Sequence, residues 1–64
     1  MSYEADTASR YRQRATELRS IAQASRDREM ARAVRLVAIE YEAMAVAFDQ
    51  IASAATALAG PSRA

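Results

Sequence analysis

Two glutamates near the middle of the chain, Glu40 and Glu42, are the first residues whose type could support chemistry. Paired carboxylates act as general acid and base, or hold a metal ion, when they converge on one point. Residues two apart on a helix point to different faces, so Glu40 and Glu42 cannot share a proton or an ion. We therefore expect both glutamates to form ion pairs with arginines and assign them no catalytic role.

The chain contains no histidine and no cysteine. Their absence removes the commonest metal ligand, the usual acid–base group near neutral pH, and the thiolate nucleophile. The sequence also has no glycine-rich phosphate loop and no nucleophile-elbow motif. It predicts a protein that is not an enzyme, has no catalytic residue, and binds neither a cofactor nor a metal.

All nine basic residues are arginines, and they face eight acidic residues, for a net charge of +1. Eight of the arginines fall in the first 35 residues, a density that could form a surface for a polyanion. They alternate with Glu17, Asp27 and Glu29, and no aromatic stacking platform accompanies them. We expect ion pairing within the protein, and keep an arginine-rich hairpin that binds nucleic acid or an anionic membrane surface as the alternative function. The eight are Arg10, Arg12, Arg14, Arg19, Arg26, Arg28, Arg32 and Arg35.

The spacing of apolar residues predicts the elements that carry these side chains. In the second half of the chain, apolar residues recur in alternating steps of four and three, and alanine occupies every seventh position beside them. A 3.5-residue repeat held this long predicts one long helix with a seam that another helix covers. The stripe is Met30, Val34, Val37, Tyr41, Met44, Phe48, Ile51, Ala55 and Leu58, and the alanine register is Ala31, Ala38, Ala45, Ala52 and Ala59.

A shorter helix precedes the long one and is expected to begin near Ser2, its expected N-cap, or near Asp6. Its seam is Ala8, Tyr11, Ala15, Leu18 and Ala22. The two seams are out of step, which predicts a turn between them. Asp27 is the favoured N-cap of the second helix and Ser25 the alternative, while a continuous helix through residues 20–30 remains open.

Gly60 and Pro61 are expected to end the second helix. The predicted fold class is all-α: an antiparallel two-helix hairpin over about residues 3–25 and 28–59, within a single domain 1–64 whose residues 60–64 are frayed. Folding back about Asp27 places Tyr11 opposite Tyr41. The same register predicts the contacts Ala8–Met44 and Ala15–Val37 and the ion pairs Arg12–Glu40 and Arg10–Glu42.

A chain of 64 residues buries too little surface to be stable without a further constraint. With no disulfide and no metal, self-association remains, so we expect a four-helix bundle or a higher helical oligomer, with a dimer favoured. Residues 51–59 project beyond the first helix, where they belong either to the self-association surface or to a docking helix for another protein. The expected interface consists of Met30, Val34, Val37, Tyr41, Met44, Ala45, Phe48, Ile51, Ala52, Ala55 and Leu58.

The apolar stretch 43–60 raises the question of a membrane. Asp49 lies near its middle, where an aspartate costs ~2.5–3.5 kcal/mol on insertion scales, so we do not expect it to cross a bilayer. The first residues also lack a basic segment followed by an apolar one. We therefore expect a cytoplasmic protein.

Two segments resemble a group of short bacterial proteins. Residues 11–19 (YRQRATELR) and 38–45 (AIEYEAMA) are similar to their shared pattern Y-R-x-R-A-x-E-L-R, a short turn, and A-x-E-Y-E-x-x-A. The resemblance covers about residues 10–46 and implies a helical hairpin. It transfers no active site, because the function of that group is unassigned. The alanine-rich segment after Phe48 lies beyond the shared pattern.

Overall fold

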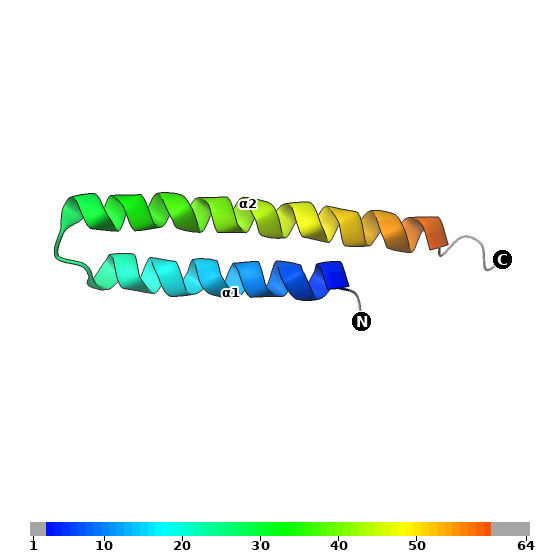
Figure 1. Cartoon of the computed structure of the whole chain (residues 1–64), viewed down its shortest axis with the longest axis horizontal. Helices are drawn as coiled ribbons and strands as arrows, with labels where there is room; N and C mark the ends of the chain where they lie inside the picture. The colour runs from blue at the N-terminus through cyan, green and yellow to red at the C-terminus, as the bar shows by residue number, and fades with distance from the viewer. Residues whose placement is uncertain (1–2, 60–64) are drawn as a thin grey trace.

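The protein is a hairpin of two antiparallel helices that lie side by side (Figure 1). The computed structural model describes residues 3–59, in which α1 spans Tyr3–Ala24 and α2 spans Arg28–Ala59. The predicted all-α hairpin is confirmed. The expected roles of Ser2, Gly60 and Pro61, and the frayed tail 60–64, lie outside the described residues.

A three-residue turn, residues 25–27, reverses the chain. The Oδ1 atom of Asp27 accepts hydrogen bonds from the backbone N–H groups of Glu29 at 2.9 Å and Met30 at 3.2 Å, so Asp27 caps α2 as predicted. Ser25 stabilises the turn itself: its hydroxyl accepts the N–H of Asp27 at 3.3 Å and donates to the carbonyl of Asp27 at 3.2 Å. The continuous helix through residues 20–30 is therefore excluded.

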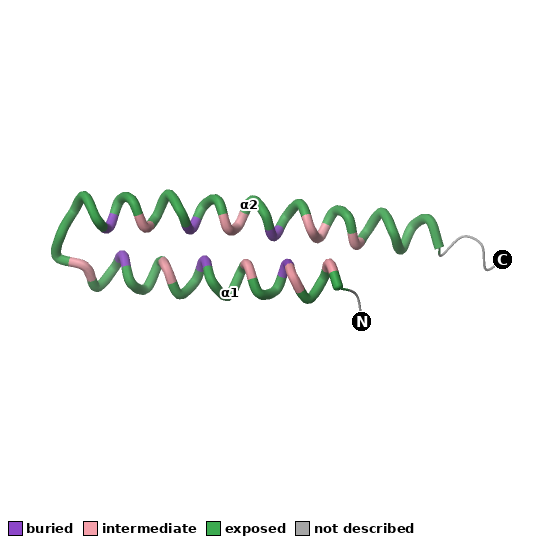
Figure 2. The backbone as a smooth tube through the Cα atoms, viewed as in Figure 1, coloured by how far each residue is buried: buried purple, intermediate pink, exposed green. Residues whose placement is uncertain are grey.

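The core of the hairpin is a row of alanines from each helix. Figure 2 shows the buried positions on the sides of α1 and α2 that face each other. In the sequence these positions recur every seven residues within each helix. Small side chains allow helix backbones to come closer than the usual 8–10 Å or so. The alanine register, which we expected at the flank of the contact, is in fact its centre. The buried residues are Ala8, Ala15 and Ala22 of α1 and Ala31, Ala38 and Ala45 of α2.

Larger side chains flank the alanines and stay half-buried. The Tyr11 ring of α1 lies between two aromatic rings of α2, with centroids 5.5 Å from Tyr41 and 5.7 Å from Phe48. The predicted contact between Tyr11 and Tyr41 is thus confirmed. Leu18 and Val34 occupy equivalent half-buried positions nearer the turn. The three rings form an aromatic cluster where α1 and α2 lie side by side.

The predicted ion-pair partners are wrong, because the ends of the helices are not level. The first turn of α2 lies beyond the last turn of α1, so residues of α1 face later positions of α2 than a simple reversal about Asp27 implies (Figure 1). Arg12 pairs with Asp49 instead of Glu40, and Glu42 pairs with Arg19 instead of Arg10. Val37 and Met44, expected opposite Ala15 and Ala8, lie at an edge of the contact and remain exposed.

Candidate interaction surface

The two long edges of the hairpin differ in chemistry. On one edge, Arg12 pairs with Asp49 and Arg19 with Glu42 at 2.5 Å; we call these four residues the ionic edge. The hydrogen bond from Arg19 lowers the pKa of the Glu42 carboxyl and raises the pKa of the Arg19 guanidinium. The hydrogen bond to Asp49 likewise raises the pKa of Arg12. All four side chains are about half exposed, so these pairs select the register of the helices more than they stabilise it.

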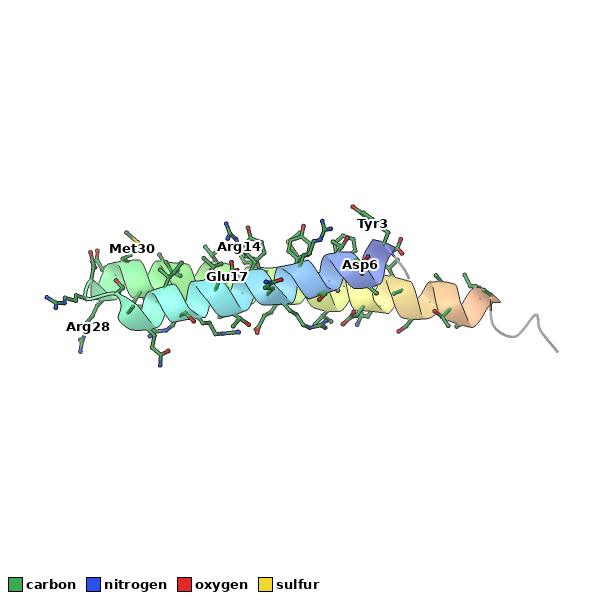
Figure 3. All side chains as sticks on the ribbon, turned by 90° about the horizontal axis from the view of Figure 1, so that it is seen from below. Tyr3, Asp6, Arg14, Glu17, Arg28 and Met30 are labelled. Atoms are coloured by element: carbon green, nitrogen blue, oxygen red, sulfur yellow. The ribbon has the colours of Figure 1, made fainter. Side chains whose placement is uncertain are left out.

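The opposite edge is apolar along α2, while α1 adds Arg14, which pairs with Glu17, to it. Figure 3 shows Met30 of α2 on the same edge as Arg14 and Tyr3 of α1. Residues seven apart share a helix face, so Ile21 follows Arg14 along α1 and four further residues follow Met30 along α2. Their side chains expose between 41% and 84% of their surface. We call this set the apolar edge: Ile21, Met30, Val37, Met44, Ile51 and Leu58.

The aromatic cluster lies directly behind the apolar edge, with a shallow groove on each side of Tyr11 and Tyr41. One groove is lined by these two rings together with Val37, Glu40 and Met44. The other groove is lined by residues of α1 beside the same two rings. A surface that joins exposed aliphatic side chains, half-buried rings and grooves is typical of a protein interface. The α1 residues of the second groove are Tyr3, Thr7, Arg10, Tyr11 and Arg14.

The expected interface residues fall into two groups according to their burial in the hairpin. The first group packs against α1 within the hairpin, where Ala45 is buried and the others are half-buried. The second group is exposed and remains available to a partner. The packed residues are Val34, Tyr41, Ala45, Phe48 and Ala52, and the exposed ones are Met30, Val37, Met44, Ile51, Ala55 and Leu58.

Sequence reasoning missed two features of this surface. It paired Arg12 and Glu42 with the wrong partners, although the seven-residue spacing shared by Arg12 and Arg19 and by Glu42 and Asp49 was visible. It also left Ile21 out of the interface, although Ile21 is more than half exposed. In an antiparallel helix pair, residues on the same side of the heptad seam in the two helices meet along one edge. This rule places Arg12 on the edge of Glu42 and Asp49. It also places Ile21 on the edge of Met30.

A second apolar strip lies on another face of α2. Leu36, Ile39 and Val46 are about half exposed, and Ala43 is exposed between them. Beyond this strip, α2 extends past the start of α1, and residues 51–59 lack a covering helix for most of their length (Figure 1). The packing of α1 against α2 therefore leaves much of the apolar surface of α2 exposed.

Within residues 3–59, no three acidic side chains lie close enough together to hold a metal ion. Over the same residues, neither helix combines the length and the apolar character needed to cross a bilayer. Three arginines, Arg12, Arg14 and Arg19, are engaged in ion pairs with acidic side chains. Comparisons with protein-family models, curated proteins and solved structures found no match to this chain. The exposed surface of the hairpin is therefore the feature that bears on its function.

Proposed function

We propose that this protein is a non-enzymatic self-association module, a small scaffold or adaptor subunit that works by helix packing. The observation that supports this proposal is the apolar edge, a continuous row of exposed aliphatic side chains beside a half-buried aromatic cluster. Exposed apolar surface of this extent is typical of interfaces. The favoured assembly is a dimer that forms a four-helix bundle.

Light scattering of the full chain at low micromolar concentration tests the proposal. We expect twice the monomer mass of 7.0 kDa. A matched pair of substitutions locates the surface, because Val37 lies on the apolar edge and Ile39 on the second strip, and both are exposed β-branched residues. Val37→Glu is expected to give monomers and Ile39→Glu to leave the dimer intact. A folded wild-type monomer at all concentrations would refute self-association.

Exposure of residues 51–59 favours a second candidate function, docking to another protein. Leu58 is 84% exposed, and Ile51, Ala55 and Leu58 have the spacing with which a helix enters a groove. In this case the hairpin acts as a rigid adaptor and α2 carries the binding residues past its end. Loss of a captured partner on substitution of Leu58, with an unchanged particle mass, would support this candidate over the first.

Two further assignments are part of the proposal. We propose a cytoplasmic location for the protein. We also propose that it is related to the short bacterial hairpin proteins that share its two sequence patterns. The hairpin turn at residues 25–27 falls between those two patterns, as the resemblance implies.

A further inference from the structure

All three tyrosines of the chain line one groove between α1 and α2, together with two arginines. The groove has a volume of about 360 Å³, and all its lining residues except Tyr41 belong to α1. Two of them, Tyr3 and Arg14, lie on the same edge of the hairpin in Figure 3. We call this the tyrosine groove, and its lining residues are Tyr3, Thr7, Arg10, Tyr11, Arg14 and Tyr41.

Two rings of the tyrosine groove are fixed by packing within the hairpin. Tyr11 stacks on Phe48 with an angle of 19° between the ring planes, and it meets the Tyr41 ring at 41°. Tyr11 and Tyr41 are half-buried, whereas Tyr3 exposes 74% of its surface. Aromatic rings favour contact with another planar ring, in stacked or tilted arrangements. Rings that are already held in place also lose little freedom when a ligand binds.

The tyrosine groove is also positively charged. Arg10 forms no ion pair within residues 3–59, although Asp6 lies one helical turn before it. Arg14 pairs with Glu17 at 3.1 Å, and the pKa of its guanidinium is raised first by this hydrogen bond and then by one with Tyr41. None of the lining residues is acidic. Because a guanidinium binds carboxylate or phosphate oxygens through two parallel hydrogen bonds, an anion in this groove gives Arg10 the partner that it lacks.

From these contacts we propose that the tyrosine groove binds a small aromatic anion, a planar ring that carries a carboxylate or a phosphate group. The ring packs against the tyrosine side chains, and the anionic group lies between Arg10 and Arg14. The volume of about 360 Å³ is near the lower end of the range for ligand sites, about 300–1,000 Å³, so the groove suits one ring and not a polymer. The site lies within one chain and does not depend on self-association. Because the ligand contacts both helices, it stabilises the hairpin.

Another hollow of the hairpin contains arginines but no aromatic ring. It is lined by Arg19, Gln23, Arg35 and Ile39. Arg19 is already paired with Glu42 at 2.5 Å, and the lining offers no surface on which a ring stacks. Arg35 forms no ion pair within the described part of the chain. It is therefore a matched control for Arg10, because substitution of either residue removes one unpaired positive charge.

Nuclear magnetic resonance of the tyrosine ring protons tests the proposal in the full chain, with phenyl phosphate as the probe. We expect saturable shifts of the ring signals of Tyr3, Tyr11 and Tyr41. Inorganic phosphate, which lacks the ring, and phenol, which lacks the charge, are expected to bind roughly tenfold more weakly. Phenyl phosphate should also raise the midpoint of thermal unfolding, because it binds only the folded chain.

Three single substitutions locate the site, and all three side chains are exposed, so circular dichroism is expected to show an intact fold. Arg10→Gln is expected to weaken the binding of phenyl phosphate roughly tenfold, because it removes the unpaired guanidinium from the groove. Glu17→Gln should strengthen the binding, since it releases Arg14 from its partner within the chain. Arg35→Gln, the control, removes the same charge elsewhere and should leave the affinity unchanged.

Four results would overturn the proposal. The first is the absence of saturable shifts at millimolar phenyl phosphate. The second is an affinity for inorganic phosphate or for phenol equal to that for phenyl phosphate, which would show that charge or ring alone is recognised. The third is an equal loss of affinity in Arg10→Gln and Arg35→Gln, which would show attraction by net charge only. The fourth is tighter binding of polyuridylate than of phenyl phosphate, lost in Arg10→Gln, which would assign the groove to single-stranded nucleic acid.

Discussion

Arg19 of α1 donates a hydrogen bond to the Glu42 carboxylate of α2 at 2.5 Å, across the ionic edge. This contact lowers the pKa of Glu42 from its ordinary value of about 4.5. A carboxyl whose pKa is lowered by folding stabilises the folded state above its unfolded pKa, and this stabilisation is lost as the pH falls through the lowered value. The ion pair therefore stabilises the hairpin near neutral pH, and this stabilisation is lost in acid.

The first prediction concerns this dependence on pH. Wild-type protein is expected to be more stable than Glu42→Gln at pH 7, and the difference should disappear as the pH falls through the acid range and Glu42 becomes protonated. Thermal melts of both proteins from pH 7 to pH 2 measure it. A difference that stays constant over the whole range would show that the charge of Glu42 has no part in it. Exchange of both charges, Arg19→Glu with Glu42→Arg, should recover the stability at pH 7.

The second prediction concerns the alanine core. Ala45 is fully buried between the helices, whereas Ala43 is exposed on the second strip. Ala45→Leu is expected to overpack the contact and lower the free energy of unfolding by ~1–3 kcal/mol. Ala43→Leu adds the same atoms on the outside and should change it little. If urea denaturation finds Ala43→Leu the more damaging, the strip of Leu36, Ile39 and Val46 is a packed interface instead.

The hairpin itself was predictable because its signals are local and periodic. The alternating steps of three and four fixed both helices to within a residue, and the carboxylate of Asp27 marked where α2 begins. The alanines were recognised as positions of close approach. Their role as the core of the contact was not, since larger residues such as Met44 were expected to be buried first. In a pair of helices this close, there is room at the centre only for a methyl group.

The pairing across the hairpin was not predictable in the same way. It depends on how far the turn displaces the two helix ends along their axes, and three turn residues do not encode that offset in their types. A displacement of about one turn, roughly 5.4 Å, is enough to exchange every ion-pair partner. The seven-residue spacing of Arg12 and Arg19 is visible in the sequence, but the sequence does not specify which acidic residue faces each arginine.

The third prediction concerns the cap of α2. Asp27 accepts the N–H groups of Glu29 and Met30, which would otherwise have no intrahelical partner. Asp27→Ala is expected to lower the free energy of unfolding by ~0.5–2 kcal/mol, and Asp27→Ser, which keeps an acceptor oxygen, by much less. Chemical denaturation followed by circular dichroism compares the two. Equal losses would show that the charge of Asp27, and not its hydrogen bonds, stabilises the turn.

The fourth prediction concerns the arginine-rich alternative. Arg12, Arg14 and Arg19 are occupied by acidic side chains, which leaves Arg28, Arg32 and their neighbours near the turn as the most accessible basic group. We expect no retention of the protein on DNA, RNA or anionic vesicles at low salt. Retention that declines steeply as salt is added, and that disappears in Arg28→Gln/Arg32→Gln, would instead favour polyanion binding.

The last prediction separates the two uses of the projecting end of α2. A chain that ends at Gln50 keeps all six buried alanines and the aromatic cluster, so it keeps most contacts within the hairpin and loses the packing of the half-buried Ala52. It loses Ile51 and Leu58, two exposed residues of the apolar edge. If these residues belong to the dimer, the shortened chain should dissociate to monomers and melt at a lower temperature than the full chain. Light scattering and thermal melts at several concentrations measure both effects. A shortened chain that remains a dimer of unchanged stability would assign residues 51–59 to docking with another protein, because their apolar surface would then have no part in self-association.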